Sequence, residues 1–407
     1  MKQLKKLVYV LIVLITACSF MACDHNADET STYKGTSAPT PPQSDGLTYL
    51  PANPSRPNAT IGISMPSAGL QRWKQDGQNM AKILQAAGYY VYLMYAANNS
   101  NQQIDDIDYL ISKGCDVLIV APVDGSALTN ALANTRAVVN DELSEDIKVI
   151  SYDRLIMDTS AVDYYATFDN LYVGQLQGNY IKNRIDLDNR TGENPIYMEF
   201  FTGDPGDNNI NFFFGGAMYV LQPYLTSGAI VCRSGQSSIN QCATLEWSTE
   251  NAHDRMANLI TSNNYGPGEN NNRLDAVLCS NDSTAQGVIG ALSDAGYTAQ
   301  NFPVITGQDC DIYSVRAIKN GKQSMSVFKD TRILAAKACE IVDAVILGTT
   351  VPGADTTTYY NRYEYSDTGT PVPVYVPSYL CNSMIVDASN YRDVLIGSGY
   401  YTNADLY

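Results

Sequence analysis

Histidine is scarce in this chain of 407 residues, which contains only His25 and His253. A Ser-His-Asp or Cys-His catalytic site would have to use His253, which lies in a predicted helix and follows no predicted strand. The chain also lacks a glycine-rich phosphate loop, and no two of its nine cysteines have the spacing of zinc ligands. We therefore expect no enzymatic activity, no cofactor and no bound metal.

Basic residues are also few. Lysine and arginine number 26 against 42 aspartates and glutamates, which gives a net charge of −16. Proteins that bind nucleic acid or an anionic membrane surface neutralise phosphates with basic side chains, so the sequence predicts neither partner. The length and the hydrophobic content of 45% instead favour a folded protein with two domains.

The apolar run at the N-terminus, residues 7–15, is too short to span a bilayer as a helix. It follows Lys2, Lys5 and Lys6 and therefore predicts an export signal over residues 1–17. The next residue, Cys18, follows Ile-Thr-Ala as in a bacterial lipobox, so we expect it to be acylated, with Cys23 as the alternative. An ordinary secretory signal is the second interpretation. Both predict an extracytoplasmic protein, which in the first case touches the membrane only through its lipid anchor.

Residues 18–58 are rich in Ser, Thr, Pro, Asn and Asp and predict a flexible tether, which ends where a strand-like run begins at Ala59. Further along, Cys232 and Cys242 flank a stretch rich in Gly and Ser. Their spacing would permit a disulfide in an oxidising compartment, and free thiols are the alternative.

Strand-like and helix-like segments alternate from residue 59 onward. Continuous apolar strands between amphipathic helices are typical of parallel sheets covered on both faces, and the number of units favours two doubly wound lobes. The predicted strands include Tyr90–Tyr95, Val117–Ala121, Lys148–Tyr152, Pro195–Phe200, Leu274–Ser280, Val304–Thr306 and Ser324–Phe328. The predicted helices include Gln71–Ala87, Ser126–Asn140, Leu171–Arg184, Asn208–Leu221, Thr249–Ser262, Thr284–Ala295 and Thr331–Leu347.

Ligands bind beyond the carboxyl ends of such strands, and here those ends carry carboxylates, amides, a few cations and both tryptophans. Sugar hydroxyls both donate and accept hydrogen bonds, and the C–H face of a pyranose packs on a flat aromatic ring. The pattern therefore favours a sugar site. A glycoside-acting enzyme stays open because paired carboxylates are present, although such an enzyme needs one carboxyl with a raised pKa. The strand-end candidates are Arg72, Trp73, Asp124, Asp153, Arg154, Asn209, Trp247, Asn281, Asp309 and Lys329.

Several of these segments, in their order along the chain, resemble the periplasmic sugar-binding proteins of ABC transporters, in particular the D-xylose-binding and multiple-sugar-binding branch. The resemblance spans nearly all of residues 60–407. It rests on Gly62-Ile63-Ser64-Met65-Pro66 with Arg72-Trp73, Ser151-Tyr152-Asp153-Arg154, Ala166-Thr167-Phe168-Asp169-Asn170, Asp207-Asn208-Asn209, Ser280-Asn281-Asp282, Gly307-Gln308-Asp309-Cys310-Asp311 and Val327-Phe328-Lys329.

The resemblance implies a type I periplasmic-binding fold, in which two α/β lobes are joined by a hinge that the chain crosses three times. We expect an N-terminal lobe of residues 59–165 and 329–375, and a C-terminal lobe of residues 166–328 and 376–407. The family further implies that a monosaccharide such as xylose, glucose or galactose is held between the lobes, and we expect the protein to be a monomer. It would deliver the sugar to a permease, or present it to a chemoreceptor or sensor kinase.

The resemblance also assigns roles to residues. It implies that Trp73 and Trp247 stack on the sugar from opposite lobes, and that Arg72 and the Asp153–Arg154 pair bind its hydroxyls. Departures from the family lie at Asp330, in the loop 235–241, in Phe212-Phe213-Phe214 and in the segment 356–373. The remaining contacts that the family implies are Asn281, Asp309 and Lys329, with Asn209 as a weaker candidate.

Overall fold

The computed structural model describes residues 46–136 and 146–406. Its first sheet has six parallel strands in the order β13-β5-β4-β3-β1-β2. The strand β1, next to the edge strand β2, pairs through Ile61 with Val91 on one side and Val117 on the other. The strands are β1 (Thr60–Met65), β2 (Tyr90–Tyr95), β3 (Val117–Val120), β4 (Lys148–Tyr152), β5 (Tyr164–Phe168) and β13 (Ser378–Cys381).

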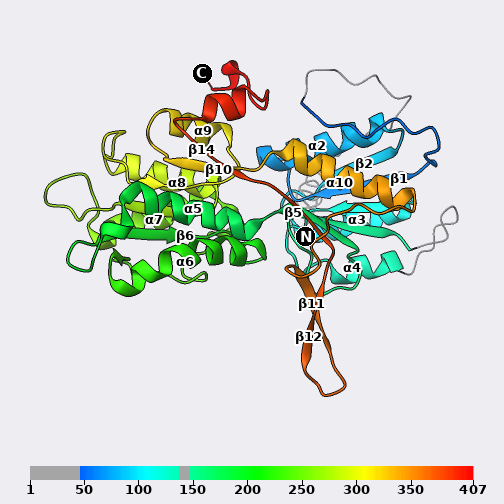
Figure 1. Ribbon diagram of the computed structural model, residues 1–407, viewed down its shortest axis with the longest axis horizontal. Helices are drawn as coiled ribbons and strands as arrows, with labels where there is room; N and C mark the ends of the chain where they lie inside the picture. The colour runs from blue at the N-terminus through cyan, green and yellow to red at the C-terminus, as the bar shows by residue number, and fades with distance from the viewer. Residues whose placement is uncertain (1–45, 137–145, 407) are drawn as a thin grey trace, which may run out of the picture. The chain divides into compact units, whose positions relative to one another are not determined.

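Helices cover both faces of this first sheet. One apolar cluster joins it to α2 and α10, and a second cluster joins its other face to α3 and α4 (Figure 1). Ile61, Ile63 and Leu118 are fully buried in these clusters, and each contributes about 2 kcal/mol of hydrophobic stabilisation. The helices are α2 (Gln71–Ala86), α3 (Ser100–Ser112), α4 (Thr129–Ala133) and α10 (Thr331–Ile346).

The second sheet has four parallel strands in the order β7-β6-β8-β9. A parallel bridge from Gln308 to Val327 continues it to β10, which pairs antiparallel with β14. Helices α5 and α6 pack on one face of the sheet, and α7 and α8 pack on the other. The elements are β6 (Ile196–Phe201), β7 (Ile230–Val231), β8 (Ala276–Cys279), β9 (Val304–Ile305), β10 (Met325–Phe328), β14 (Met384–Asp387), α5 (Asn170–Ile185), α6 (Asn209–Ser227), α7 (Thr249–Asn263), α8 (Asp282–Asp294) and α9 (Ile312–Lys319).

The chain passes between the two sheets after β5, after β10 and after β13, so the expected fold of two doubly wound lobes with a three-crossing hinge is confirmed. The crossing points differ from the expected boundaries. Both β5 and β13 belong to the first sheet, where Tyr379 pairs with Ala166. The boundaries at residues 165/166 and 375/376 therefore fall too early in the sequence.

The last part of the expected tether is packed on the first lobe. Leu47, Tyr49 and Leu50 contact its apolar core, and Arg56 Nε pairs with Asp343 Oδ1 on α10 at 2.5 Å. The prediction of a flexible tether is therefore wrong for residues 46–58. Residues 18–45 lie outside the described residues. So do the last four residues of the helix predicted over 126–140, the signal segment and both lipidation candidates.

The segment 356–373 forms most of a β-hairpin of β11 (Tyr360–Tyr365) and β12 (Pro371–Tyr375), which extends away from the first sheet (Figure 1). Its base is fixed: buried Asn361 donates to the carbonyls of Ile156 and Thr159. The Tyr359 ring packs 4.9 Å from Phe212 of α6. Short helical turns complete the description at Asn134–Arg136, Leu187–Asn189, Leu245–Trp247, Arg392–Ile396 and Asn403–Leu406.

Candidate functional site

Arg72 and Trp73 lie in the first turn of α2, directly after the loop that follows β1. This is the carboxyl edge of the first sheet, where parallel α/β proteins place their ligands. Both side chains are nevertheless buried, with exposed fractions of 8% and 4%. They are therefore held inside the protein and do not project into solvent.

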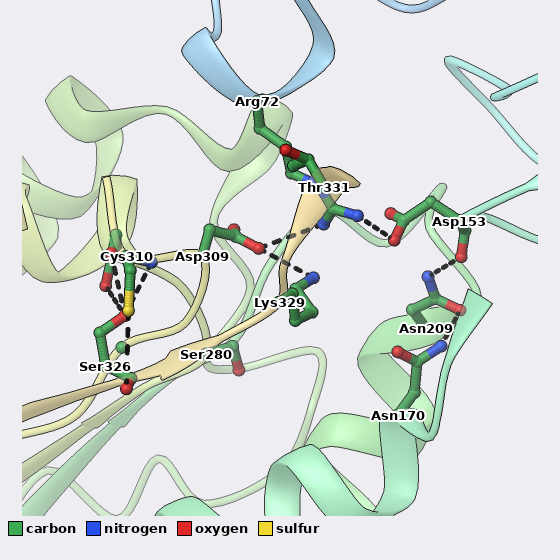
Figure 2. Close-up of polar contacts among 12 residues, drawn as sticks. Arg72, Asp153, Asn170, Asn209, Ser280, Asp309, Cys310, Ser326, Lys329 and Thr331 are labelled. Carbon is green, nitrogen blue, oxygen red and sulfur yellow. Dashed lines mark hydrogen bonds and ion pairs between the residues drawn. The ribbon is translucent and has the colours of Figure 1, made fainter. Parts of the chain in front are cut away.

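Arg72 connects the two lobes. Its guanidinium pairs with Asp153, at the end of β4, and its Nη1 lies 3.1 Å from Asp309 Oδ1, which follows β9 of the second sheet (Figure 2). Its Nε lies 3.3 Å from Asp76 Oδ2 on the next turn of α2. The buried cation is thus surrounded by carboxylates from both lobes, as a buried charge requires.

Two further cations complete the polar ring. Lys329 follows β10, has a side chain only 2% exposed and places Nζ 2.9 Å from Asp309 Oδ1. Arg154, from the first lobe, places Nε 2.9 Å from Asp207 Oδ2, in the loop before α6 of the second lobe. Ion pairs therefore link the two lobes at a second place.

The charge states of the carboxylates follow from these contacts. Burial alone would raise the pKa of Asp153, but Arg72, Lys329 and Arg154 outweigh it and hold that pKa below its usual value. Burial raises the pKa of Asp76 to about 7, against the opposing effects of Arg72 and of the Tyr152 hydroxyl. That hydroxyl donates to Asp76 Oδ1 at 2.6 Å.

The tryptophans line the same cavity from opposite lobes. Two guanidiniums lie near the ring of Trp73, with Cζ of Arg72 and of Arg154 each 5.0 Å from its centroid. Trp247 packs over Gly203, where a Cβ atom would come within 2.1 Å of the indole. Only glycine at position 203 allows this close approach.

Asn209 belongs to the first turn of α6, and its Nδ2 donates to the Asp153 carbonyl at 2.8 Å (Figure 2). Its Oδ1 accepts from Asn170 Nδ2 at 3.0 Å and from the Tyr165 hydroxyl at 3.1 Å. Asn209 therefore fixes the first lobe against the second, and Asn170 supports it.

Asn281 is the N-cap residue of α8, and its Oδ1 accepts from the Thr284 amide at 3.0 Å and from the Thr284 hydroxyl at 2.6 Å. It also lines the cavity. The capping and ligand interpretations are therefore compatible, because the cap uses the amide oxygen and leaves the Nδ2 donor for a ligand.

Strained backbone gathers at this site. Asp153, Trp247 and Asp309 have φ angles of 58°, 54° and 96°, in the left-handed region that residues other than glycine rarely adopt. Such conformations persist where the surrounding structure enforces them, and they concentrate at functional sites.

The cavity has a volume of about 470 Å³, including the part that opens to solvent. It brings together every strand-end candidate except Asp124, which lies beside Gly206 and uses its carboxylate to accept the Ser126 amide at 2.8 Å. The cavity residues that the sequence analysis did not select are Leu70, Asp207, Phe213, Ser283, Gln308 and Asp311.

Of the two alternatives for Cys232 and Cys242, the structure has free thiols and no disulfide. Their Sγ atoms donate to the same carbonyl, that of Gln236, at 3.5 Å and 3.2 Å. Within residues 46–136 and 146–406, no group of three or more His, Cys, Asp or Glu side chains is arranged to hold a metal ion. No helix in this part of the chain has the length and hydropathy to cross a membrane.

Several known proteins are similar to this chain in architecture and in sequence. A family model for the periplasmic binding protein domain matches residues 61–350. The multiple sugar-binding periplasmic protein SbpA of Azospirillum brasilense is 43% identical over 349 residues, which are 85% of this chain and 91% of SbpA. This chain belongs to the periplasmic binding protein family.

Two further members show the same relationship. The multiple sugar-binding periplasmic receptor ChvE of Rhizobium radiobacter is 41% identical over 344 residues, covering 84% of this chain and 90% of ChvE. The crystal structure of an ABC transporter solute binding protein from Clostridium phytofermentans, with bound β-D-glucose, is 47% identical. The two structures superpose with a TM-score of 0.77, and the match covers 86% of this chain and 100% of the Clostridium phytofermentans chain. The resemblance seen in the sequence is thereby confirmed.

Proposed function

We propose that this periplasmic binding protein captures a monosaccharide of the aldose class in the cavity between its lobes and delivers it to an ABC transporter permease. The observation that carries the proposal is the cavity itself, in which Trp73 and Trp247 from opposite lobes border a ring of carboxylates, amides and cations. This is the combination that an uncharged polyol with an apolar ring face requires.

The lobes offer a physical basis for capture and release. Arg72 and Arg154 reach from the first lobe to Asp309 and Asp207 of the second. A sugar that bonds to these same groups adds contacts to both lobes at once. It therefore stabilises the closed arrangement over an open one by its differential affinity.

Titration calorimetry with D-glucose, D-xylose, D-galactose, L-arabinose and D-ribose tests the proposal. We expect one sugar per chain to bind, and the bound sugar to raise the melting temperature by mass action. The absence of heat and of any melting shift with every sugar at millimolar concentration would refute it. The same samples, incubated with aryl glycosides, should release no product, because we assign no catalytic role to the site.

A second candidate function is sugar sensing, in which the closed protein is presented to a chemoreceptor or sensor kinase. The observation that favours it is the similarity to ChvE, which is named a receptor. Deletion of the chain's gene separates the two functions: loss of sugar uptake favours transport, and loss of a sugar-induced transcriptional or motility response with normal uptake favours sensing.

We also propose that the chain is anchored outside the cytoplasm by a lipid on Cys18, with Cys23 as the alternative, and that it acts as a monomer. The predicted signal over residues 1–17 supports the anchor. Metabolic labelling with a fatty-acid analogue should mark the wild type and not Cys18→Ala. Labelling that survives in Cys18→Ala and is lost in Cys23→Ala would move the anchor to the alternative residue.

A further inference from the structure

The charges around the cavity do not balance. The cations Arg72, Arg154 and Lys329 are each paired, and between them they neutralise Asp153, Asp207 and Asp309. Asp311 is a further carboxylate that lines the same cavity. It forms no hydrogen bond or ion pair through its side chain with any residue that the structure describes. The cavity lining therefore carries an excess of negative charge.

Asp311 has no structural role that would account for this carboxylate. It stands at the N-cap position of α9, yet its side chain accepts no hydrogen bond from that helix. Its own amide donates to Asp282 Oδ2 at 2.9 Å, which places a second carboxyl behind it. Burial, and then the neighbouring Asp309, raise the pKa of Asp311 to about 7, against the opposing effects of Arg72 and Lys329. A cationic group beside Asp311 would favour its ionised form and lower that pKa.

Gln308, in the same loop, provides an independent observation. Its side chain is 1% exposed and lines the cavity. Its Oε1 accepts no hydrogen bond from any of the described residues. Buried acceptors are almost always satisfied, so an orphaned one on a cavity wall indicates a ligand that brings the donor. Gln308 and Asp311 thus present acceptors without donors on one side of the cavity.

We propose that the cavity also accepts monoamino aldoses, sugars in which one hydroxyl is replaced by an ammonium group, and that Asp311 is the residue that selects for this group. The inference rests on the proposed function, because it assumes that the cavity binds an aldose. A hydroxyl supplies one donor and no charge. An ammonium supplies three donors and the positive charge that the lining lacks. Its three donors allow it to bond to more than one acceptor at the same time.

The size of the preference follows from the shielding of the site. An opposite charge a few ångströms away changes the equilibrium of a buried carboxylate by about one to three pKa units, which corresponds to a tenfold or larger factor in binding. We therefore expect an amino sugar whose ammonium reaches Asp311 to bind about tenfold more tightly than its neutral parent. Replacing Asp311 by the isosteric asparagine should abolish that preference, measured as the ratio of the two dissociation constants.

The experiment is a calorimetric titration at pH 7.0 of D-glucosamine, 6-amino-6-deoxy-D-glucose and D-galactosamine, each beside its parent D-glucose or D-galactose. The proteins are the wild type, Asp311→Asn and Asp367→Asn. The last variant removes an equal charge from the exposed turn of the β11–β12 hairpin, so it controls for net charge alone. Circular dichroism and the melting temperature establish that each variant is folded.

The proposal is supported if at least one amino sugar binds about tenfold more tightly than its parent in the wild type and in Asp367→Asn, and loses this advantage in Asp311→Asn. It is overturned if every amino sugar binds more weakly than its parent, or if the advantage persists in Asp311→Asn. If the parent sugars bind and no amino sugar is preferred, the inference about Asp311 is overturned and the proposed function stands. If neither the parent sugars nor the amino sugars bind, the proposed function itself has failed.

Discussion

Replacing Trp247 by alanine tests the sugar-stacking role most sharply. The ring is 6% exposed, packs on Gly203 and meets Phe213 edge to face at 6.4 Å, so its orientation is fixed before a ligand arrives. A ring that is 6% exposed offers a pyranose roughly 15 Å² of apolar surface. With the matching area on the sugar, about 30 Å² is removed from water, which at about 25 cal/mol per Å² contributes about 0.8 kcal/mol. Stacking adds about 0.5–1 kcal/mol.

The expected loss for Trp247→Ala is therefore about 1.5 kcal/mol, or roughly a tenfold increase in Kd. Calorimetric titration with the tightest-binding sugar measures it directly. Trp247→Phe keeps a flat ring and should lose only about threefold, whereas Trp247→Leu keeps apolar volume without a flat face and should resemble alanine. A Kd for Trp247→Ala within twofold of the wild type, in a protein with an unchanged circular dichroism spectrum, would refute the stacking role.

Three further changes probe the supports of the site. Gly203→Ala places a methyl group 2.1 Å from the Trp247 indole, so the ring must move, and we expect a tenfold or larger loss of sugar affinity in titration. Lys329→Met removes the cation 2.9 Å from Asp309 and should weaken sugar binding by about 2 kcal/mol, as for a lost hydrogen bond to a charged group. Asp76→Asn should flatten the pH dependence of stability. The pKa of Asp76 is about 7 in the folded protein, against about 3.9 when unfolded. Between these two pKa values the folded state keeps a proton on Asp76 that the unfolded state has released. The contribution of this neutral carboxyl to the free energy of unfolding is therefore lost as the pH rises through 7.

Each of these expectations has a contradicting result. Unchanged affinity in Gly203→Ala would show that the position of Trp247 does not matter to the ligand, and unchanged affinity in Lys329→Met would remove the lysine from the site. For Asp76, urea denaturation of the sugar-free protein between pH 5 and 8 should show the unfolding free energy of the wild type falling more steeply than that of Asp76→Asn. If the unfolding free energies of the two proteins change in parallel with pH, the raised pKa of Asp76 is contradicted.

The sequence predicted the elements well where the apolar pattern is continuous. The strands at Tyr90–Tyr95 and Lys148–Tyr152 match the expected ranges residue for residue, because a buried parallel strand is apolar on both faces and ends where polar residues begin. The same rule located the cavity residues at the carboxyl ends of strands. It could not separate Arg72, which turns inward beside Asp153, from Asp124, which closes a local turn.

Other features depend on tertiary contacts that a linear pattern does not carry. The strand β13 was placed in the wrong lobe because its pairing with β5 joins segments about two hundred residues apart in sequence. Residues 47–50 look like linker in composition, yet their few apolar side chains are enough to dock on the first lobe. Gln308 and Asp311 lay within a recognised motif, but their lack of partners became visible only when their surroundings were known.

The most direct test of the account is a crystal structure of the protein grown with the tightest-binding aldose. The account predicts one sugar ring in the cavity, with Trp73 and Trp247 on its two sides and hydrogen bonds to residues of both lobes, among them Arg72, Asp153 and Asp309. A sugar bound elsewhere, or one that contacts a single lobe and leaves both indoles uncovered, would contradict the central claim.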